Sequence, residues 1–231
     1  MKMIKALVAG SILMFASNSF AALVISISDG TESVTVSDFN SDGIVSYDSD
    51  FSDMLAMIDP NLAWDSATWE SVAVKGFGSD YYDDPLIDTL HLNVVAASGR
   101  SGGELTIMLS ETDLTKDDAL FSLDFGGLLD GEVSIETYIS KSNDLFATDT
   151  LLGSILASGD GGIVGSDNGE VPDGNNPYSM TIVATITHSG KGVSSFDAET
   201  KVPEPASLAL LGAGLLGLGA VARRNRRKNI A

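Results

Sequence analysis

The chain has no cysteine and only two histidines among its 231 residues. The lack of cysteine excludes disulfide bonds, thiolate metal sites and a cysteine nucleophile. His91 alternates with Thr89 and Asn93 on the polar side of a predicted strand, so we expect it simply to face solvent. His188 ends another predicted strand beside Ser189 and Gly190, where a polar residue is ordinary. The sequence therefore predicts no catalytic residue.

Basic residues are also scarce, with 13 Lys and Arg against 32 Asp and Glu. Seven of the basic residues lie in the terminal segments described below, whereas all but one of the acidic residues lie between them. The central part, residues 22–202, thus carries a formal charge of about −25. Nucleic acids and anionic membrane surfaces are polyanions, so this charge argues against both as partners. Divalent cations and basic partners remain compatible with it.

Long apolar runs are absent except near the two ends of the sequence. Met1–Ala21 has two early lysines, an apolar run over Ala6–Ala16, and small residues at Ser19 and Ala21. This order is that of a secretory signal peptide with cleavage after Ala21. The apolar run is too short to span a bilayer as an uncleaved helix. We therefore expect export through the Sec machinery.

The second apolar run belongs to a segment with three parts in fixed order, Lys201–Ala231. Pro203, Glu204 and Pro205 come first, and the prolines favour an exposed, extended backbone that joins no helix or sheet ladder. The uncharged residues 206–222 follow, near the lower length limit for a transmembrane helix and diluted by glycine. A basic cluster, which the positive-inside tendency would keep in the cytoplasm, comes last: Arg223, Arg224, Arg226, Arg227 and Lys228.

These three parts resemble the PEP-CTERM sorting signal of bacterial surface proteins. The resemblance covers about the last thirty residues and assigns no chemistry to the rest. It implies an exosortase-type membrane transpeptidase as a partner, which would remove the helix and release or transfer the remainder to the cell surface or extracellular matrix. Together with the signal peptide, it divides the chain into three regions: a signal peptide (1–21), an ectodomain (22–202) and a sorting signal (203–231).

Alternating apolar residues dominate the ectodomain, with turns rich in Gly, Asp and Asn between them. This period of two predicts antiparallel strands with one polar face. We expect an all-β fold, an antiparallel β-sandwich of jelly-roll or immunoglobulin-like type, with one short helix near Asp53–Ile58. The glycine-rich segment Ser158–Pro177 is expected to be a long surface loop, and Glu199–Val202 a short stem. The alternating segments are 23–27, 34–36, 72–74, 90–94, 105–109, 121–125, 133–137 and 180–186.

One loop is a candidate calcium site. Asp38, Asn40 and Asp42 place oxygen ligands at alternate positions before Gly43, which resembles the start of an EF-hand or dockerin-type calcium loop. The twelfth position, where a bidentate carboxylate is expected, is Ser49. A polar turn uses the same residue types, so both interpretations stay open. Calcium is the only cofactor that the sequence suggests.

Four aromatic residues, Trp64, Trp69, Tyr81 and Tyr82, could form a platform on which sugar rings stack, or they could fill the core. Three classes of function follow. The first is a surface or matrix protein with a structural or adhesive ectodomain and no enzyme activity. The alternative is a module that binds polysaccharide or calcium. The third is an extracellular hydrolase or lyase, which needs two carboxylates that converge in a groove.

Overall fold

The computed structural model describes residues 22–38, 40–51, 64, 66–82, 84, 86–116, 120–172 and 177–203. The elements are β1 (Leu23–Ser28), β2 (Ser33–Ser37), β3 (Ile44–Asp48), the 3-10 turn η1 (Ser49–Phe51), β4 (Trp69–Phe77), α2 (Ser79–Tyr82), β5 (Ile87–Ser98), β6 (Gly103–Leu114), β7 (Leu120–Ser140), β8 (Thr150–Glu170), β9 (Tyr178–His188) and β10 (Gly192–Pro203). The expected signal peptide (1–21), the expected sorting signal apart from Pro203 (204–231) and the expected helix at 53–58 lie outside these residues.

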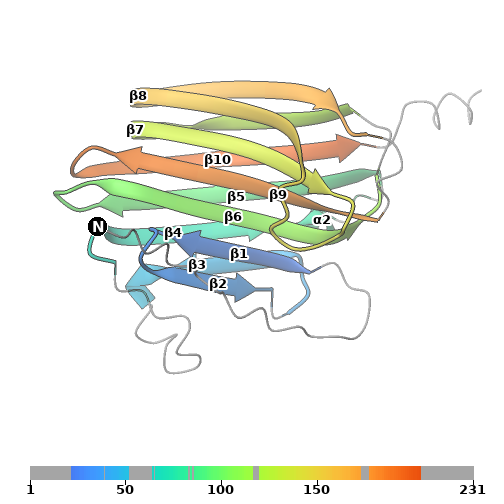
Figure 1. Ribbon diagram of the computed structural model, residues 1–231, viewed down its shortest axis with the longest axis horizontal. Coiled ribbons are helices and arrows are strands. Elements are labelled where there is room, and N and C mark those ends of the chain that lie inside the picture. Colours follow the sequence, from blue (N-terminus) through green and yellow to red (C-terminus); the bar gives the residue numbers. More distant parts are fainter. Residues whose placement is uncertain are drawn as a thin grey trace, which may run out of the picture.

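All strand pairs are antiparallel, as the alternating pattern predicted. The strands form one continuous sheet in the order β2-β1-β6-β9-β7-β10-β5-β4-β3, with β8 paired to β7 (Figure 1). Every segment in which apolar residues alternate lies in one of these strands. The all-β, antiparallel prediction is therefore confirmed. The choice between a jelly-roll and an immunoglobulin-like sandwich stays a prediction.

The long strand β7 joins the two halves of the sheet. Its first part, Ser122–Leu128, pairs with β10, and its second part, Glu132–Ser140, pairs with β9. Between them Gly131 has a φ of 120° and lies opposite Gly159 of β8, whose φ is 138°. Only glycine adopts such φ values readily, so this pair lets both strands change direction together. The bend turns one half of the sheet towards the other.

The core lies between the two halves. Leu109 of β6 and Gly76 of β4 come from opposite halves, and a Cβ on Gly76 would lie 2.5 Å from the Cδ1 of Leu109. Glycine at this position therefore sets how closely the two halves approach. Every strand from β4 to β10, except β8, contributes fully buried apolar side chains, and the largest are Trp69, Tyr178, Phe121 and Phe196.

Two parts of the sequence-based prediction were wrong. Residues 158–170, expected in a surface loop, belong to the 21-residue strand β8. Glycine-rich sequence usually marks loops, but here glycines let the two arms of β8 approach. A Cβ on Gly169 would lie 3.2 Å from the Leu152 carbonyl oxygen and 2.5 Å from the Phe121 ring. Pairing with β7 makes this segment a strand, which its composition alone does not predict.

The expected stem Glu199–Val202 is part of β10, which has neighbours on both sides up to Lys201. Val202 is fully buried. Pro203, expected to join no ladder, lies opposite Ile87 of β5. A proline is tolerated there because the register with β7 already ends at Lys201, so no neighbour requires its missing N–H. Glu204 and Pro205 lie outside the described residues.

Candidate functional site

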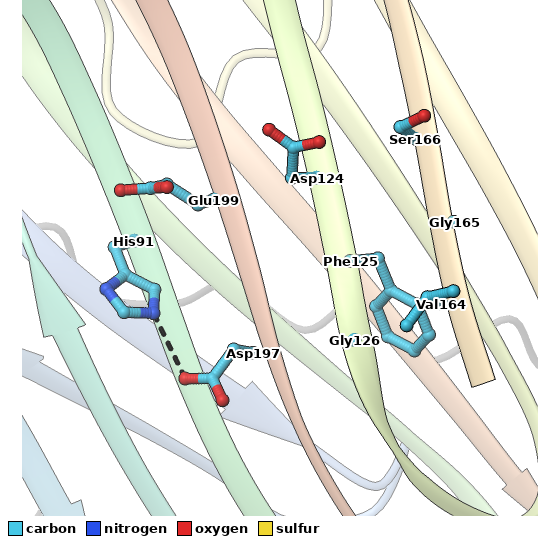
Figure 2. A pocket seen from close by; sticks show the side chains of 9 residues that line it. All are labelled: His91, Asp124, Phe125, Gly126, Val164, Gly165, Ser166, Asp197 and Glu199. Carbon is cyan, nitrogen blue, oxygen red and sulfur yellow. Dashed lines mark hydrogen bonds and ion pairs between the residues drawn. The ribbon is translucent and has the colours of Figure 1, made fainter. Parts of the chain in front are cut away.

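An open groove of about 770 Å³ crosses the outer face of the sheet over β5, β10, β7 and β8 (Figure 2). Strand alternation supplies its polar groups, since Asp197 and Glu199 flank the buried Ala198, and Asp124 flanks the buried Phe125. The groove is polar because β7 and β10 bury every second residue here and expose the residues between. Its lining consists of His91, Asp124, Phe125, Gly126, Val164, Gly165, Ser166, Asp197 and Glu199.

Asp197 is the most firmly oriented side chain of the groove. Its Oδ1 accepts hydrogen bonds from Nε2 of His91, at 3.0 Å, and from Nδ2 of Asn93, at 2.8 Å. The other imidazole nitrogen, Nδ1, lies 2.9 Å from the hydroxyl of Tyr82. With the imidazole proton on Nε2, the Tyr82 hydroxyl donates to His91 and His91 donates to Asp197. Three side chains from α2, β5 and β10 are thereby linked in a row.

The other two carboxylates differ in their partners. Asp124 and Glu199 lie directly opposite each other on β7 and β10. Glu199 forms an ion pair of 2.5 Å with Lys201. Asp124 is exposed, and in the part of the chain that the structure describes it forms no ion pair. The groove lining has three carboxylates and no Lys or Arg.

Aromatic rings extend the site beyond the groove. Phe77 stacks on His91 with a centroid distance of 5.4 Å and contacts Tyr81 at 4.7 Å. Tyr81 meets Tyr82 edge to face at 5.2 Å. The Nζ atom of Lys75 lies 4.9 Å from the centroid of the Phe77 ring. We call Phe77, Tyr81 and Tyr82 the aromatic cluster. Since His91 contacts both Phe77 and Tyr82, the cluster is continuous with the groove.

Of the two tyrosines of the cluster, Tyr81 is 46% exposed and Tyr82 is 36% exposed. Burial of the phenol, and then the nearby charges of Glu199, Tyr81 and Asp197, raise the pKa of Tyr82 to about 12. Its hydroxyl therefore keeps its proton at neutral pH and can donate to His91. An exposed ring with a protonated hydroxyl suits contact with a ligand that is partly apolar and partly polar.

Two neighbours hold α2 in place. Gly43, with a φ of 73°, lies so close that an added Cβ would be 2.3 Å from the Tyr81 amide nitrogen. From the other side, the buried Glu111 of β6 accepts hydrogen bonds from the amide and hydroxyl of Ser79. Burial, opposed in part by these bonds, raises the pKa of Glu111 to about 8. Contacts from β6 and from the turn before β3 thus position both tyrosines.

The candidate calcium residues form a hydrogen-bonded turn. Asp38 accepts from the amides of Asn40, at 3.0 Å, and Gly43, at 2.9 Å. Asp42 accepts from the amide of Ile44 at 3.1 Å. Close contact with α2 accounts for the glycine at position 43 without a cation. Within the described residues, no group of three His, Asp or Glu side chains is arranged to hold a metal ion. Calcium binding stays a prediction.

The structure separates the four aromatic residues of the expected platform. Trp69 is buried, donates from Nε1 to the carbonyl of Glu104 at 3.2 Å and contacts the His188 ring, so of the two interpretations it fills the core. Trp64 is half-buried against the core. Tyr81 and Tyr82 remain exposed and instead combine with Phe77.

Sequence reasoning also missed the contacts of His91. His91 was expected only to face solvent, yet it links Tyr82 to Asp197. That contact depends on the register of β5 with β10, about one hundred residues away, which no local pattern shows. His188 is buried and lies within 2.8 Å of the hydroxyls of Ser98 and Ser194. Burial lowers the pKa of His188, which favours a neutral structural role.

Comparison with protein families supplies the sorting information. Residues 201–227 match the model of the PEP-CTERM protein-sorting motif. The chain carries a PEP-CTERM sorting signal. The match begins inside β10, at Lys201, and contains the Pro203-Glu204-Pro205 triplet and all four arginines of the basic cluster. A comparison with curated proteins found no match.

Several solved structures are similar at low level. The enzymatically active domain of tailspike protein 4 from bacteriophage CBA120 is 13% identical, with a TM-score of 0.36 over 66% of this chain and 18% of that one. The CBM22-1 xylan-binding domain of Paenibacillus barcinonensis Xyn10C is 12% identical, with a TM-score of 0.31 over 61% of this chain and 86% of that one. Structural similarity at this level assigns no function to the chain.

No helix in the described residues is long and apolar enough to cross a membrane. The expected span, 206–222, lies outside them.

Proposed function

We propose that this chain is an exported bacterial surface or extracellular-matrix protein, which an exosortase-type transpeptidase sorts and processes through its C-terminal signal. The match of residues 201–227 to the PEP-CTERM motif carries the proposal. In this account, the signal peptide 1–21 directs export through the Sec machinery with cleavage after Ala21. Residues 206–222 then hold an inner-membrane intermediate, and the basic cluster at 223–227 stays in the cytoplasm.

The ectodomain has a structural or adhesive role in this proposal and no catalytic one. The fold supports this role because an antiparallel sheet with a large apolar core is stable without disulfides. We interpret the folded sheet as a β-sandwich of jelly-roll or immunoglobulin-like type. The proposed cleavage region begins where β10 ends, so the released ectodomain would keep all its strands.

Processing can be tested with Glu204→Ala, which keeps both prolines and the apolar run but removes the only charge of the triplet. Full-length protein and released ectodomain are followed by immunoblotting of membrane and released fractions, in a host with the transpeptidase and in one without it. We expect release of the wild-type ectodomain only in the first host, and membrane retention of the variant in both. Ser207→Ala, a matched substitution just beyond the triplet, should be processed as wild type.

Two outcomes contradict the sorting proposal. If the wild-type chain stays full length in both hosts, the C-terminal segment is a permanent anchor. If Glu204→Ala and Ser207→Ala are released equally well, the triplet does not direct processing. Neutral replacements of Arg223, Arg224, Arg226 and Arg227 should instead disturb orientation and retention.

A second candidate function for the ectodomain is polysaccharide binding. The observation that favours it is the continuity of the groove with the exposed aromatic cluster through His91. Sugar rings have apolar C–H faces and polar edges, and binding sites combine apolar or aromatic surface with a few fixed polar groups. The same site brings Asp124 and Glu199 to opposite positions. A catalytic role for them is not part of this proposal.

A further inference from the structure

We propose that the groove and the aromatic cluster form one binding site for a polysaccharide of amino sugars, a chain whose rings carry free, protonated amines. This inference rests on polysaccharide binding as the second candidate function. It adds the chemical class of the ligand and the residues that select it.

The shape of the site comes first. His91 lines the groove, stacks on Phe77 and contacts the Tyr82 hydroxyl. Tyr81 lies on the far side of Phe77, with a centroid distance of 4.7 Å. The groove runs from β8 and β7, across β10, to β5 (Figure 2). The hydrogen bond between His91 and Tyr82 continues the site to α2. A surface that crosses several strands suits an extended polymer better than a single small molecule.

The charge of the site selects among polysaccharides. Asp124, Asp197 and Glu199 line the groove, and no Lys or Arg does. Lys201 neutralises Glu199, but Asp124 and Asp197 remain exposed to a ligand. The ectodomain around them carries a formal charge of about −25. A polymer of uronic acids would be repelled, whereas a polymer with ammonium groups would be attracted and oriented.

The aromatic cluster supports the same class of ligand. The ammonium group of Lys75 occupies the Phe77 ring, so a ligand ammonium group would contact the exposed rings of Tyr81 and Tyr82 instead. Tyr81 and Tyr82 are exposed beside it and can contact the apolar face of a sugar ring. Amino sugars combine an apolar ring face with an ammonium group, which matches both features.

The site is also arranged before any ligand binds. His91 and Asn93 both donate to Oδ1 of Asp197, which leaves Oδ2 to accept from a ligand. Figure 2 shows this second oxygen pointing away from His91. A carboxylate held by two donors loses little conformational freedom on binding, and such preorganisation increases affinity.

Isothermal titration calorimetry of the full chain in detergent tests the inference. The probes are a hexamer of glucosamine, a hexamer of N-acetylglucosamine, a hexamer of galacturonic acid and hexalysine, in mildly acidic buffer. We expect the glucosamine hexamer to bind about tenfold more tightly than the N-acetylated hexamer, because removal of the charge removes the attraction to Asp124 and Asp197. The galacturonic acid hexamer should not bind.

Variants locate the binding. Asp197→Asn and Tyr81→Ala should each weaken glucosamine binding about tenfold, while Glu104→Gln should leave it unchanged. Glu104 is an exposed acid on β6, in the other half of the sheet, so its substitution removes the same charge from a distant position. Melting curves check that each variant folds. If Tyr81→Ala does not fold, Asp124→Asn replaces it.

Three results would overturn the inference. Equal binding of hexalysine and the glucosamine hexamer, weakened equally by Asp197→Asn and Glu104→Gln, would show attraction by the overall charge. Tight binding of the N-acetylated hexamer, lost in Tyr81→Ala, would keep polysaccharide binding but reject selection for amines. If no saccharide binds, the second candidate function falls too. The sorting proposal is independent of all three, since immunoblotting decides it.

Discussion

Pro203 lies opposite Ile87 at the end of the β5–β10 ladder, so the sorting motif begins inside the folded sheet. The residue before it, Val202, is fully buried. A cut upstream of Val202 would remove an apolar side chain from the core and shorten a strand that has neighbours on both sides. The fold thus favours processing on the C-terminal side of Pro203.

The buried carboxyl of Glu111 predicts a pH-dependent stability. Its pKa is about 8 in the folded protein against 4.5 for the free group, because burial disfavours the charged form. The folded state therefore holds this proton more tightly, and its stability falls as the pH rises from about 4.5 to 8. Each unit of difference is worth roughly 1.4 kcal/mol.

Glu111→Gln, which stays neutral and can still accept from Ser79, should flatten this part of the stability curve. The free energy of unfolding is measured with urea at pH values between about 5 and 9, roughly the range over which the shifted pKa acts. The exposed Glu104→Gln on the same strand serves as the control and should keep the wild-type slope. If Glu111→Gln and wild type have parallel curves across this range, burial does not raise the pKa of Glu111 in the folded protein.

Gly43 predicts a steric effect on the aromatic cluster. Gly43→Ala should destabilise the fold by about 1–3 kcal/mol, because the new methyl group clashes with the Tyr81 backbone at a position that also needs a positive φ. Gly30→Ala is the matched control, since Gly30 has a φ of 84° but no atom within 4 Å of the added Cβ. Urea unfolding should give a larger loss for Gly43→Ala. Equal losses would mean that α2 does not pack on this turn.

Asp29 predicts an acid-sensitive turn. Burial alone would raise its pKa, but hydrogen bonds from the Glu32 amide, the Ser66 hydroxyl and Thr31 outweigh burial and lower the pKa to about 2. The carboxylate therefore stabilises the fold above pH 3.8, and this contribution is lost as the pH falls towards 2. Asp29→Asn should lower the melting temperature at pH 7, and its difference from wild type should shrink in acid. A difference that is constant with pH would exclude a role for the charge.

The sequence was sufficient to predict most of the strands but not their partners. Alternation identified Leu90–Val94 and Met180–Ile186 because burial of every second residue is a local pattern. In contrast, β8 was missed because it is a strand only through its pairing with β7. Its glycines, which suggested a loop, instead let neighbouring parts of the folded sheet pack closely. Local composition does not contain that information.

The same limit applies to the site. Tyr81, Tyr82 and the acidic residues were visible in the sequence as types, but the groove requires the registers of β5, β10, β7 and β8. The link from Tyr82 through His91 to Asp197 joins residues from three separate elements. The sorting signal, a linear motif, was predicted from the sequence, and the family match confirms the motif at residues 201–227.

The intact mass of the ectodomain released by a host with the transpeptidase tests the central claim most directly. We predict a chain that begins at Ala22 and ends at or just beyond Pro203, with β10 complete and the apolar run and basic cluster removed. A mass that includes residues 206–231, or one that places the new end upstream of Val202, would contradict the account.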